Sequence, residues 1–242
     1  MIITKTVTLI AAPEPPFVGT TLKISVPADS LTWGIFSITK AADAESVTID
    51  WGDGETTIVT GSTTRQIPHT YASGGNYTVR VSDDASIYSF STNTANDYQS
   101  VYAPMIREAS SNATRLTTIG AGAFMNAANL VKADFSAASS LETCLPWSFN
   151  NCVNLTDLRL PDGIKKLYSQ SFGNCDGLSG RLDFPAVNQL IGSGENSPPF
   201  LGSDNITEIH LAAAYEAAIR SSASFKVSAT LGAPNATVVF DL

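Results

Sequence analysis

The stretch "FNNCVNLTDLRLP" (residues 149–161) sets an aromatic residue, two asparagines and a cysteine ahead of a series of leucines. The unit that contains it superimposes without gaps on two neighbours, the three being "LTTIGAGAFMNAANL" (116–130), "LETCLPWSFNNCVNL" (141–155) and "IKKLYSQSFGNCDGL" (164–178). At the position of Cys152, the other two units carry Ala127 and Cys175. A metal or redox site would not alternate with alanine, so the pattern predicts a rung that repeats along the chain.

Phenylalanine marks the period of these rungs. It recurs at spacings of 25, 23 and 28 residues, at Phe124, Phe149, Phe172 and Phe200. A unit of this length cannot bury its own apolar face, so successive units are expected to stack into a solenoid whose short strands pair between neighbours. We expect Asn126, Asn151 and Asn174 to bond backbone groups at the bend. The thiols of Cys152 and Cys175 are expected to be free and buried, and a disulfide between adjacent rungs is the alternative.

The amino-terminal half has a different pattern. Between residues 21 and 83 it consists of short segments with apolar residues at every second position, bounded by Gly, Pro, Asp or Ser: "TLKISVP", "TWGIFSIT", "SVTIDW", "ETTIVT" and "NYTVRV". Such spacing predicts an antiparallel β-sandwich. The sequence Trp51-Gly52-Asp53-Gly54 predicts a hairpin turn, because glycine permits positive φ and aspartate can bond its own backbone.

This half resembles the polycystic-kidney-disease (PKD) domain over roughly residues 20–100. The resemblance rests on a W-G-D-G turn followed by H-x-Y, a glycine and Y-T-V, at Trp51, Gly52, Asp53, Gly54, His69, Tyr71, Gly75, Tyr77, Val79 and Val81. The first strands do not carry the family pattern. The resemblance implies a PKD/immunoglobulin-like sandwich that serves as a non-enzymatic extracellular spacer or adhesion module.

The second half resembles the BspA-type leucine-rich repeats over about residues 114–211. "LTTIGAGAFMNAANL" carries the I-G-x-x-A-F part of that motif, and "FNNCVNLTDLRLPDGI" carries the N-C-x-N-L and L-P parts. The fourth unit departs from it, because it lacks the Asn-Cys pair around Gly202 and Ser203 and contains the insertion "GSGENSPPF". The resemblance implies a surface-associated protein that binds matrix components or other cells.

The sequence therefore predicts a mainly β chain of two modules, a sandwich followed by a short leucine-rich-repeat solenoid with a helix-strand cap. The expected order is an N-terminal segment (1–19), the PKD-like sandwich (20–90), a connector that shields the first rung (91–113), about four repeats (114–211) and a C-terminal cap (212–242).

Composition limits the partners. The formal net charge is −8, from 14 basic and 22 acidic residues, and no run of Lys or Arg could neutralise a phosphate backbone, so nucleic acid is not expected. Nowhere do eighteen apolar residues follow one another, so no membrane span is expected. The start shows no pattern of a signal peptide, and we expect export by a signal outside this sequence or, alternatively, inside a virion.

The acidic residues near His69 offer a calcium site as one interpretation. Asp50, Asp53, Asp83 and Asp84 supply carboxylates, but they form no Asp-x-Asp-x-Asp run. The interpretation that we favour is structural: Asp53 caps a turn and His69 closes a loop. No cofactor and no bound metal are therefore predicted, with Ca²⁺ as the alternative.

Catalysis is not predicted. His69 and His210 lie in different modules, and no G-x-S-x-G sequence or metal-spaced cluster occurs. The favoured function is a non-catalytic cell-surface or secreted protein that binds an extracellular protein or glycan through the exposed repeat face, at Thr156, Asp157 and Arg159. One alternative is a phage or prophage virion component, and a weaker one is a glycan-active hydrolase with two dispersed carboxylates. The oligomeric state is left open.

Overall fold

The structure is a computed structural model and describes residues 16–29, 31–33, 37–40, 46–61, 63–65, 67–82, 87–91, 103–192 and 197–242. Several features singled out in the sequence lie outside the described residues: most of the N-terminal segment, Asp83 and Asp84 of the calcium interpretation, residues 92–102 of the connector, and residues 193–196 of the insertion.

The amino-terminal half forms short strands where apolar residues alternate with polar ones. β1 shows the pattern well, because Leu22, Ile24 and Val26 are buried and Lys23 between them is exposed. The strands are β1 (Gly19–Val26), β2 (Leu31–Trp33), β3 (Ser37–Lys40), β4 (Val47–Asp50), β5 (Thr56–Val59), β6 (Thr63–Arg65), β7 (His69–Tyr71), β8 (Gly75–Ser82) and β9 (Ile87–Ser91).

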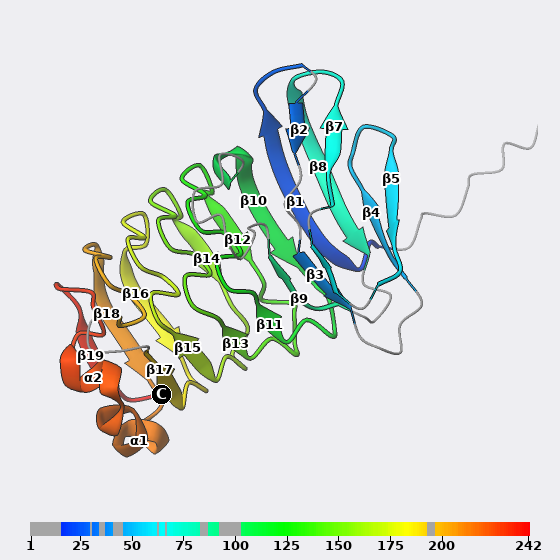
Figure 1. The fold of residues 1–242 in the computed structure, drawn as a ribbon. Helices are drawn as coiled ribbons and strands as arrows, with labels where there is room; N and C mark the ends of the chain where they lie inside the picture. Colours follow the sequence, from blue (N-terminus) through cyan, green and yellow to red (C-terminus); the bar gives the residue numbers. More distant parts are fainter. Residues whose placement is uncertain are drawn as a thin grey trace, which may run out of the picture.

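The carboxy-terminal half is a solenoid in which successive strands along the chain alternate between two layers, so that a turn contributes to both (Figure 1). A 3-10 helix, η1 (Ala103–Met105), precedes it. One layer contains β10 (Ile106–Ser111), β12 (Lys132–Asp134) and β14 (Asp157–Arg159), and in line with them lie β16 (Gly180–Phe184) and β18 (Ile206–Leu211). The other contains β11 (Thr118–Ile119), β13 (Thr143–Cys144), β15 (Lys166–Tyr168) and β17 (Gln189–Ile191).

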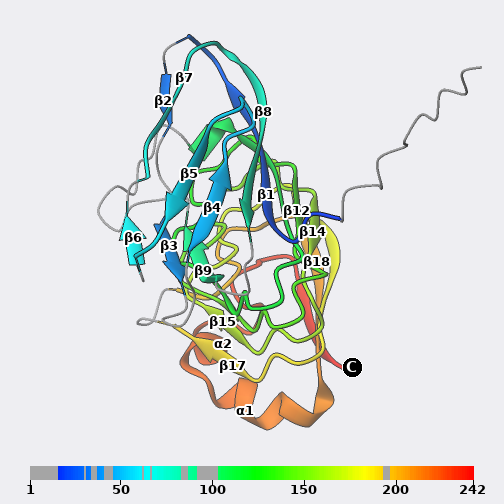
Figure 2. The same ribbon diagram turned by 90° about the vertical axis from the view of Figure 1, so that its right-hand side faces the viewer.

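The two halves share their sheets. The first sheet has the order β14-β12-β10-β1-β8-β4-β5, and the second has the order β17-β15-β13-β11-β9-β3-β6. Each sheet changes from antiparallel to parallel pairing near the junction. In the first sheet β1 is antiparallel to β10, whereas β10 is parallel to β12. In the second sheet β3 is antiparallel to β9, whereas β9 is parallel to β11. Figures 1 and 2 show both layers continuing through the molecule. The amino-terminal strands therefore cover the open end of the first repeat, which would otherwise expose unpaired backbone groups.

The core of the solenoid is a column of stacked phenylalanines. Their ring centroids are 5.0 Å apart for Phe124 and Phe149, 5.3 Å for Phe149 and Phe172, and 5.5 Å for Phe172 and Phe200, with nearly parallel planes. All four side chains are fully buried. The sequence spacing of phenylalanine is therefore a structural repeat, and its energy comes from apolar burial and ring packing.

An asparagine ladder runs beside this column. Asn126, Asn151 and Asn174 have φ values of 64°, 61° and 52°, a left-handed conformation that asparagine tolerates better than most residues. Asn151 Nδ2 donates to Asn126 Oδ1, and Asn174 Nδ2 donates to Asn151 Oδ1, both at 2.8 Å. These side chains bond each other, whereas the sequence had suggested backbone partners. At Gly202 a Cβ would lie 2.4 Å from Asn174 Oδ1, so glycine ends the ladder.

A second row of asparagines makes the backbone bonds. Asn154 Nδ2 donates to the carbonyl oxygen of Ala128 at 2.7 Å, in the preceding turn. The equivalent bonds join Asn129 to Pro104, Asn205 to Asp176 and Asn235 to Asp204. Stacked turns are thus tied by side-chain amides as well as by strand pairing.

The three cysteines are free and buried. The Cys152 thiol donates to the carbonyl oxygen of Phe124, and the Cys175 thiol to that of Phe149, each at 3.1 Å. Ser203 occupies the same place in the next turn and donates to the carbonyl oxygen of Phe172 at 2.7 Å. Burial raises the pKa of Cys175 to about 12, which keeps the thiol protonated and unreactive.

The carboxy-terminal end combines two helices with a last strand. η2 (Ala213–Tyr215), α1 (Glu216–Ser221) and α2 (Ala223–Val227) follow β18, and the helices pack beside β17. β19 (Thr237–Phe240) then pairs in parallel with β18 and completes a three-stranded sheet with β16. Leu231 and Ile219 are fully buried there, so these segments cover the apolar end of the solenoid.

Candidate functional site

The residues that the sequence suggested for binding lie at β14, on the outer face of the first sheet. Arg159 Nε donates to Asp157 Oδ1 at 2.9 Å, and Leu158 between them is packed against the core. Thr156 is exposed just before the strand, and its hydroxyl donates to the carbonyl oxygen of Val131 at 3.3 Å. The structure thus pairs Asp157 with Arg159 and places Thr156 beside them.

Charges of opposite sign alternate across this face. The register places Lys23, Glu108, Lys132 and Asp157 side by side on β1, β10, β12 and β14. Lys23 Nζ lies 2.7 Å from a Glu108 oxygen, and Lys132 Nζ lies 3.5 Å from an Asp157 oxygen. We call the set Lys23, Glu108, Lys132, Asp134, Asp157 and Arg159 the charge ladder.

The alternation also runs along each strand. Asp134 is two residues after Lys132 and pairs in register with Arg159, so every charge in this part of the face has an opposite charge beside it. β16 and β18 repeat the pattern, since Arg181 lies beside Glu208 in register, and Asp183 beside His210. These strands form a separate sheet beyond β14. The two charged residues of β16 also pair with each other, since Arg181 Nε lies 2.6 Å from Asp183 Oδ1.

Hydrogen bonds and neighbouring charges shift the pKa values of Asp134 and Arg159. Burial raises the pKa of Asp134, but hydrogen bonds from Ser136 and the charges of Lys132 and Arg159 outweigh it, so the pKa is lowered. The hydrogen bond to Asp157, followed by the charges of Asp157 and Asp134, raises the pKa of Arg159. Both shifts favour the charged forms of Asp134 and Arg159. Exposed pairs contribute about 0–1 kcal/mol each, so the ladder defines a charge pattern more than it stabilises the fold.

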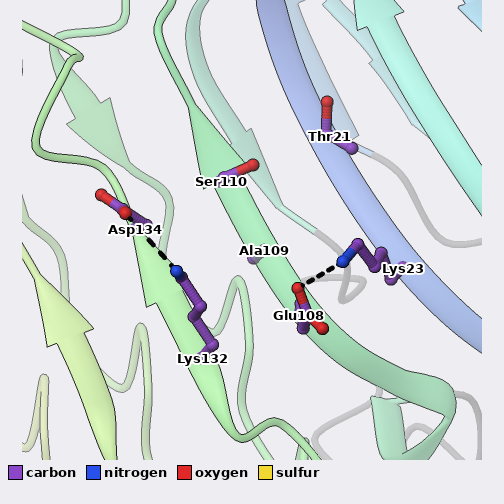
Figure 3. Close-up of a pocket in the computed structure, with 7 residues that line it drawn as sticks. All are labelled: Thr21, Lys23, Glu108, Ala109, Ser110, Lys132 and Asp134. Carbon is purple, nitrogen blue, oxygen red and sulfur yellow. Dashed lines mark ion pairs between the residues drawn. The ribbon is translucent and has the colours of Figure 1, made fainter.

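A pocket opens in this face where the two halves of the chain meet (Figure 3). Its volume is about 250 Å³, and it is lined by Thr21, Lys23, Glu108, Ala109, Ser110, Lys132 and Asp134. The lining comes from β1, β10 and β12, so it depends on the pairing of a sandwich strand with two solenoid strands. Six of the seven are polar or charged, which makes the pocket a place for a small polar group.

Sequence reasoning missed the part of this site contributed by β1 and β10. No sequence pattern connects Lys23 to Glu108, because the two strands are far apart along the chain and meet only through the shared sheet. A usable signal existed in the repeats, where "KAD", "DLR", "RLD" and "EIH" carry charged or ionisable residues at the same two outward positions with alternating sign.

The turn around Trp51 is stabilised by local contacts. Asp53 Oδ2 lies 2.7 Å from His69 Nε2, Asp53 Oδ1 accepts from the Glu55 backbone NH at 3.1 Å, and the His69 ring stacks on Trp51 with centroids 4.8 Å apart. Burial raises the pKa of Asp53, but these hydrogen bonds and the His69 charge lower it overall. The contacts match the turn interpretation of Asp53 and His69. Within the described residues, no group of three or more His, Cys, Asp or Glu side chains converges as metal ligands would.

His210 lies between two carboxylates at the other end of the face. Its Nδ1 is 2.7 Å from Asp241 Oδ1, and its Nε2 is 2.8 Å from Glu208 Oε2. Asp183 is its register partner on β16, and the positive charge of Arg181 is also close. The arrangement ties β18 to Asp241 after β19, and among the described residues no Ser, Thr or Cys hydroxyl or thiol is hydrogen-bonded to the ring.

We expect the contribution of His210 to stability to fall as the pH rises. Hydrogen bonds to Glu208 and then to Asp241 raise its pKa above 6.5, its ordinary value. A group with a raised folded-state pKa stabilises the fold fully below its unfolded pKa, and this is lost as the pH rises through the folded pKa. The melting temperature of the original chain should therefore fall further between about pH 6 and pH 9 than that of His210→Gln. Parallel melting curves for the two chains would contradict this expectation.

Among the helices of the described residues, none has the length and apolar character needed to cross a membrane.

Comparison with known proteins identifies the repeats. The family model for the BspA type leucine rich repeat region matches residues 106–228 in six copies. The sequence pattern had suggested about four units over 114–211, so the family model finds more copies and extends further at both ends. Comparisons with curated proteins and with solved structures give no match. Because the matched region covers 123 of 242 residues, more than half, the chain belongs to the BspA-type leucine-rich-repeat family.

Proposed function

We propose that this protein is a non-catalytic recognition protein, exposed at a cell surface or secreted, that binds an extracellular protein or glycan through the outer face of its first sheet. BspA-like repeat proteins are typically surface-associated or secreted, and their solenoids typically serve binding rather than catalysis. The observation that carries the proposal for this chain is the charge ladder with its pocket, which spans β1, β10, β12 and β14.

The geometry of this face suits recognition. Its side chains project from hydrogen-bonded strands, so their spacing is set before a partner arrives and little order must be gained on binding. Opposite charges at fixed positions give specificity, because a partner with a different charge pattern meets like charges. Asp157 and Arg159 at β14, with Thr156 beside them, would form the edge of the contact surface nearest the middle of the solenoid.

We also infer that the amino-terminal strands form a PKD-like sandwich with a spacer or adhesion role. The support is local: Tyr71 donates its hydroxyl proton to the carbonyl oxygen of Trp51 at 3.0 Å, and His69 bridges to Asp53 in the Trp-Gly-Asp-Gly turn. These are the residues on which the family resemblance rests. Such a module would hold β1 in place beside β10 and thereby complete the recognition face.

The decisive experiment compares binding of two triple variants. Changing Thr156, Asp157 and Arg159 together to Ala should weaken binding to a ligand found on an array of extracellular proteins and glycans by at least about tenfold, because it removes about 1.4 kcal/mol or more of contact energy. The change should leave the melting temperature nearly unaltered, since these side chains are exposed or half-buried. Surface plasmon resonance would supply both affinities.

The matched control changes Thr143, Lys166 and Gln189 to Ala. These residues lie side by side in register on the outer face of the second sheet, so the control removes a similar area from the opposite side of the solenoid. It should bind as the original chain does. Equal affinity of the two triple variants would exclude the proposed face, and a stable trimer that binds nothing on the array would favour a virion component instead.

A further inference from the structure

We propose that the pocket between β1, β10 and β12 is a subsite for one neutral, hydroxyl-rich ring, that is, a single sugar residue of a glycan. The inference rests on the proposed recognition function and adds the chemical class of the ligand. Three features of the pocket support it: an interruption of the charge pattern, a lining without net charge, and a volume suited to one ring.

The pocket lies where the charge pattern has a gap. One outward row of the first sheet contains, strand by strand, Asp50, Arg80, Thr21, Ser110, Asp134 and Arg159. Signs alternate along this row except in the middle, where Thr21 and Ser110 stand side by side. Their short hydroxyl side chains leave room that two long charged side chains would fill. The gap is thus a hollow with two hydroxyls inside a charged surround.

The lining carries no net charge. Lys23 is paired with Glu108 at 2.7 Å, and Lys132 lies 3.8 Å from Asp134. A ligand with its own charge would meet both signs at once, so its attraction to one member of a pair would be offset by repulsion from the other. A sugar hydroxyl is different, because it donates one hydrogen bond and accepts others at the same time. It can accept from an ammonium group and donate to a neighbouring carboxylate without disturbing either pair.

The size and rigidity of the pocket fit one ring. Its volume of 250 Å³ is below the range of roughly 300–1,000 Å³ that is usual for pockets of drug-sized ligands. Ala109 is buried beneath the sheet, so its backbone forms the floor between the two pairs. All seven lining residues belong to paired strands, and their backbone positions are therefore held at fixed spacing around the hollow (Figure 3).

The test uses the full chain and a panel of methyl glycosides: glucoside, galactoside, mannoside, fucoside, N-acetylglucosaminide and N-acetylgalactosaminide. We expect at least one of them to bind with a roughly millimolar dissociation constant, which is what a ligand of about a dozen heavy atoms can reach. Ligand-observed NMR would detect this binding. Ser110→Tyr and, from the other module, Thr21→Tyr should each weaken it at least about tenfold, because the ring of tyrosine occupies the hollow and strands tolerate tyrosine.

Thr143→Tyr is the matched control, since Thr143 lies in β13 on the outer face of the second sheet. It should bind the glycosides as the original chain does, and the melting temperatures of all three variants should agree. Two results would overturn the sugar subsite: no binding by any member of the panel, or the same binding after Ser110→Tyr.

The source of the sugar is tested with the array ligand. A glycoprotein should lose binding when its glycans are removed enzymatically, whereas a free glycan should compete with the methyl glycoside. A protein ligand that binds equally without its glycans and to Ser110→Tyr, yet is lost with the Thr156, Asp157 and Arg159 triple variant, would refute the subsite and leave the proposed function standing.

Discussion

Replacing Phe149 with Ala is expected to lower the free energy of unfolding by about 3–5 kcal/mol, the usual cost of removing a buried phenylalanine ring. Phe149 is fully buried and stacks on Phe124 on one side and on Phe172 on the other. Its removal leaves a cavity in the middle of the column, and the neighbouring rungs cannot collapse into it without breaking their strand pairing. Urea unfolding followed by circular dichroism would give the value.

Val153→Ala serves as the control in the same turn. Its side chain is 37% exposed, so its truncation should cost less than about 0.5 kcal/mol. A loss below about 1 kcal/mol for Phe149→Ala would mean that the column is not the main source of stability in the solenoid. Such a result would also mean that the regularly spaced phenylalanines contribute little to the free energy of unfolding.

The second large effect is expected at Asn151. Asn151→Ala should lower the free energy of unfolding by about 3–4 kcal/mol. Alanine is strained by about 1–2 kcal/mol at a φ of 61°, and the two hydrogen bonds to Asn126 and Asn174, of about 1 kcal/mol each, disappear. Asn151→Gly removes the same hydrogen bonds but accepts the left-handed conformation. It should therefore cost less, by about the strain energy of alanine.

The difference between the two variants separates the energy of the asparagine side-chain hydrogen bonds from the energy of the left-handed backbone conformation. Gly202 shows that the chain itself uses glycine at this position, with a φ of 75°. Equal losses for Asn151→Ala and Asn151→Gly in urea unfolding would mean that backbone strain plays no part and that only the side-chain bonds matter. A negligible loss for glycine would show the reverse, that the asparagines are there for their conformation.

Much of the repeat architecture was predictable from sequence because its determinants are local. The in-phase positions of Phe, Asn and Cys identified the rungs, and the structure confirms that Phe149 and Cys152 face the interior at equivalent points. The direction of the asparagine bonds was harder to predict. An amide at a bend can bond either the backbone or the next amide. Asn151 and Asn154 bridge the same two turns but bond different partners, so the place of each residue within the turn selects the partner.

The candidate site was predictable only in part. Asp157 and Arg159 stood out as exposed residues of a repeat strand, but a repeat pattern carries no information about what lies beside the first repeat. Lys23 and Glu108 come together because β1 pairs with β10. Along the chain, most of the sandwich lies between these two strands. Long-range pairing of this kind is decided by the total burial of both sheets and not by any local residue preference.

The amino-acid sequence alone therefore establishes the solenoid, its period, the buried role of its cysteines and the membership of the repeat family, since each depends on residues that recur at short range. The tertiary structure is needed for the rest: the shared sheets, the alternating charges across β1, β10, β12 and β14, and the pocket lined by Thr21 and Ser110. The physical reason is that a neighbour across a sheet is set by backbone pairing between distant segments, whereas a neighbour along a repeat is set by the spacing of the chain itself.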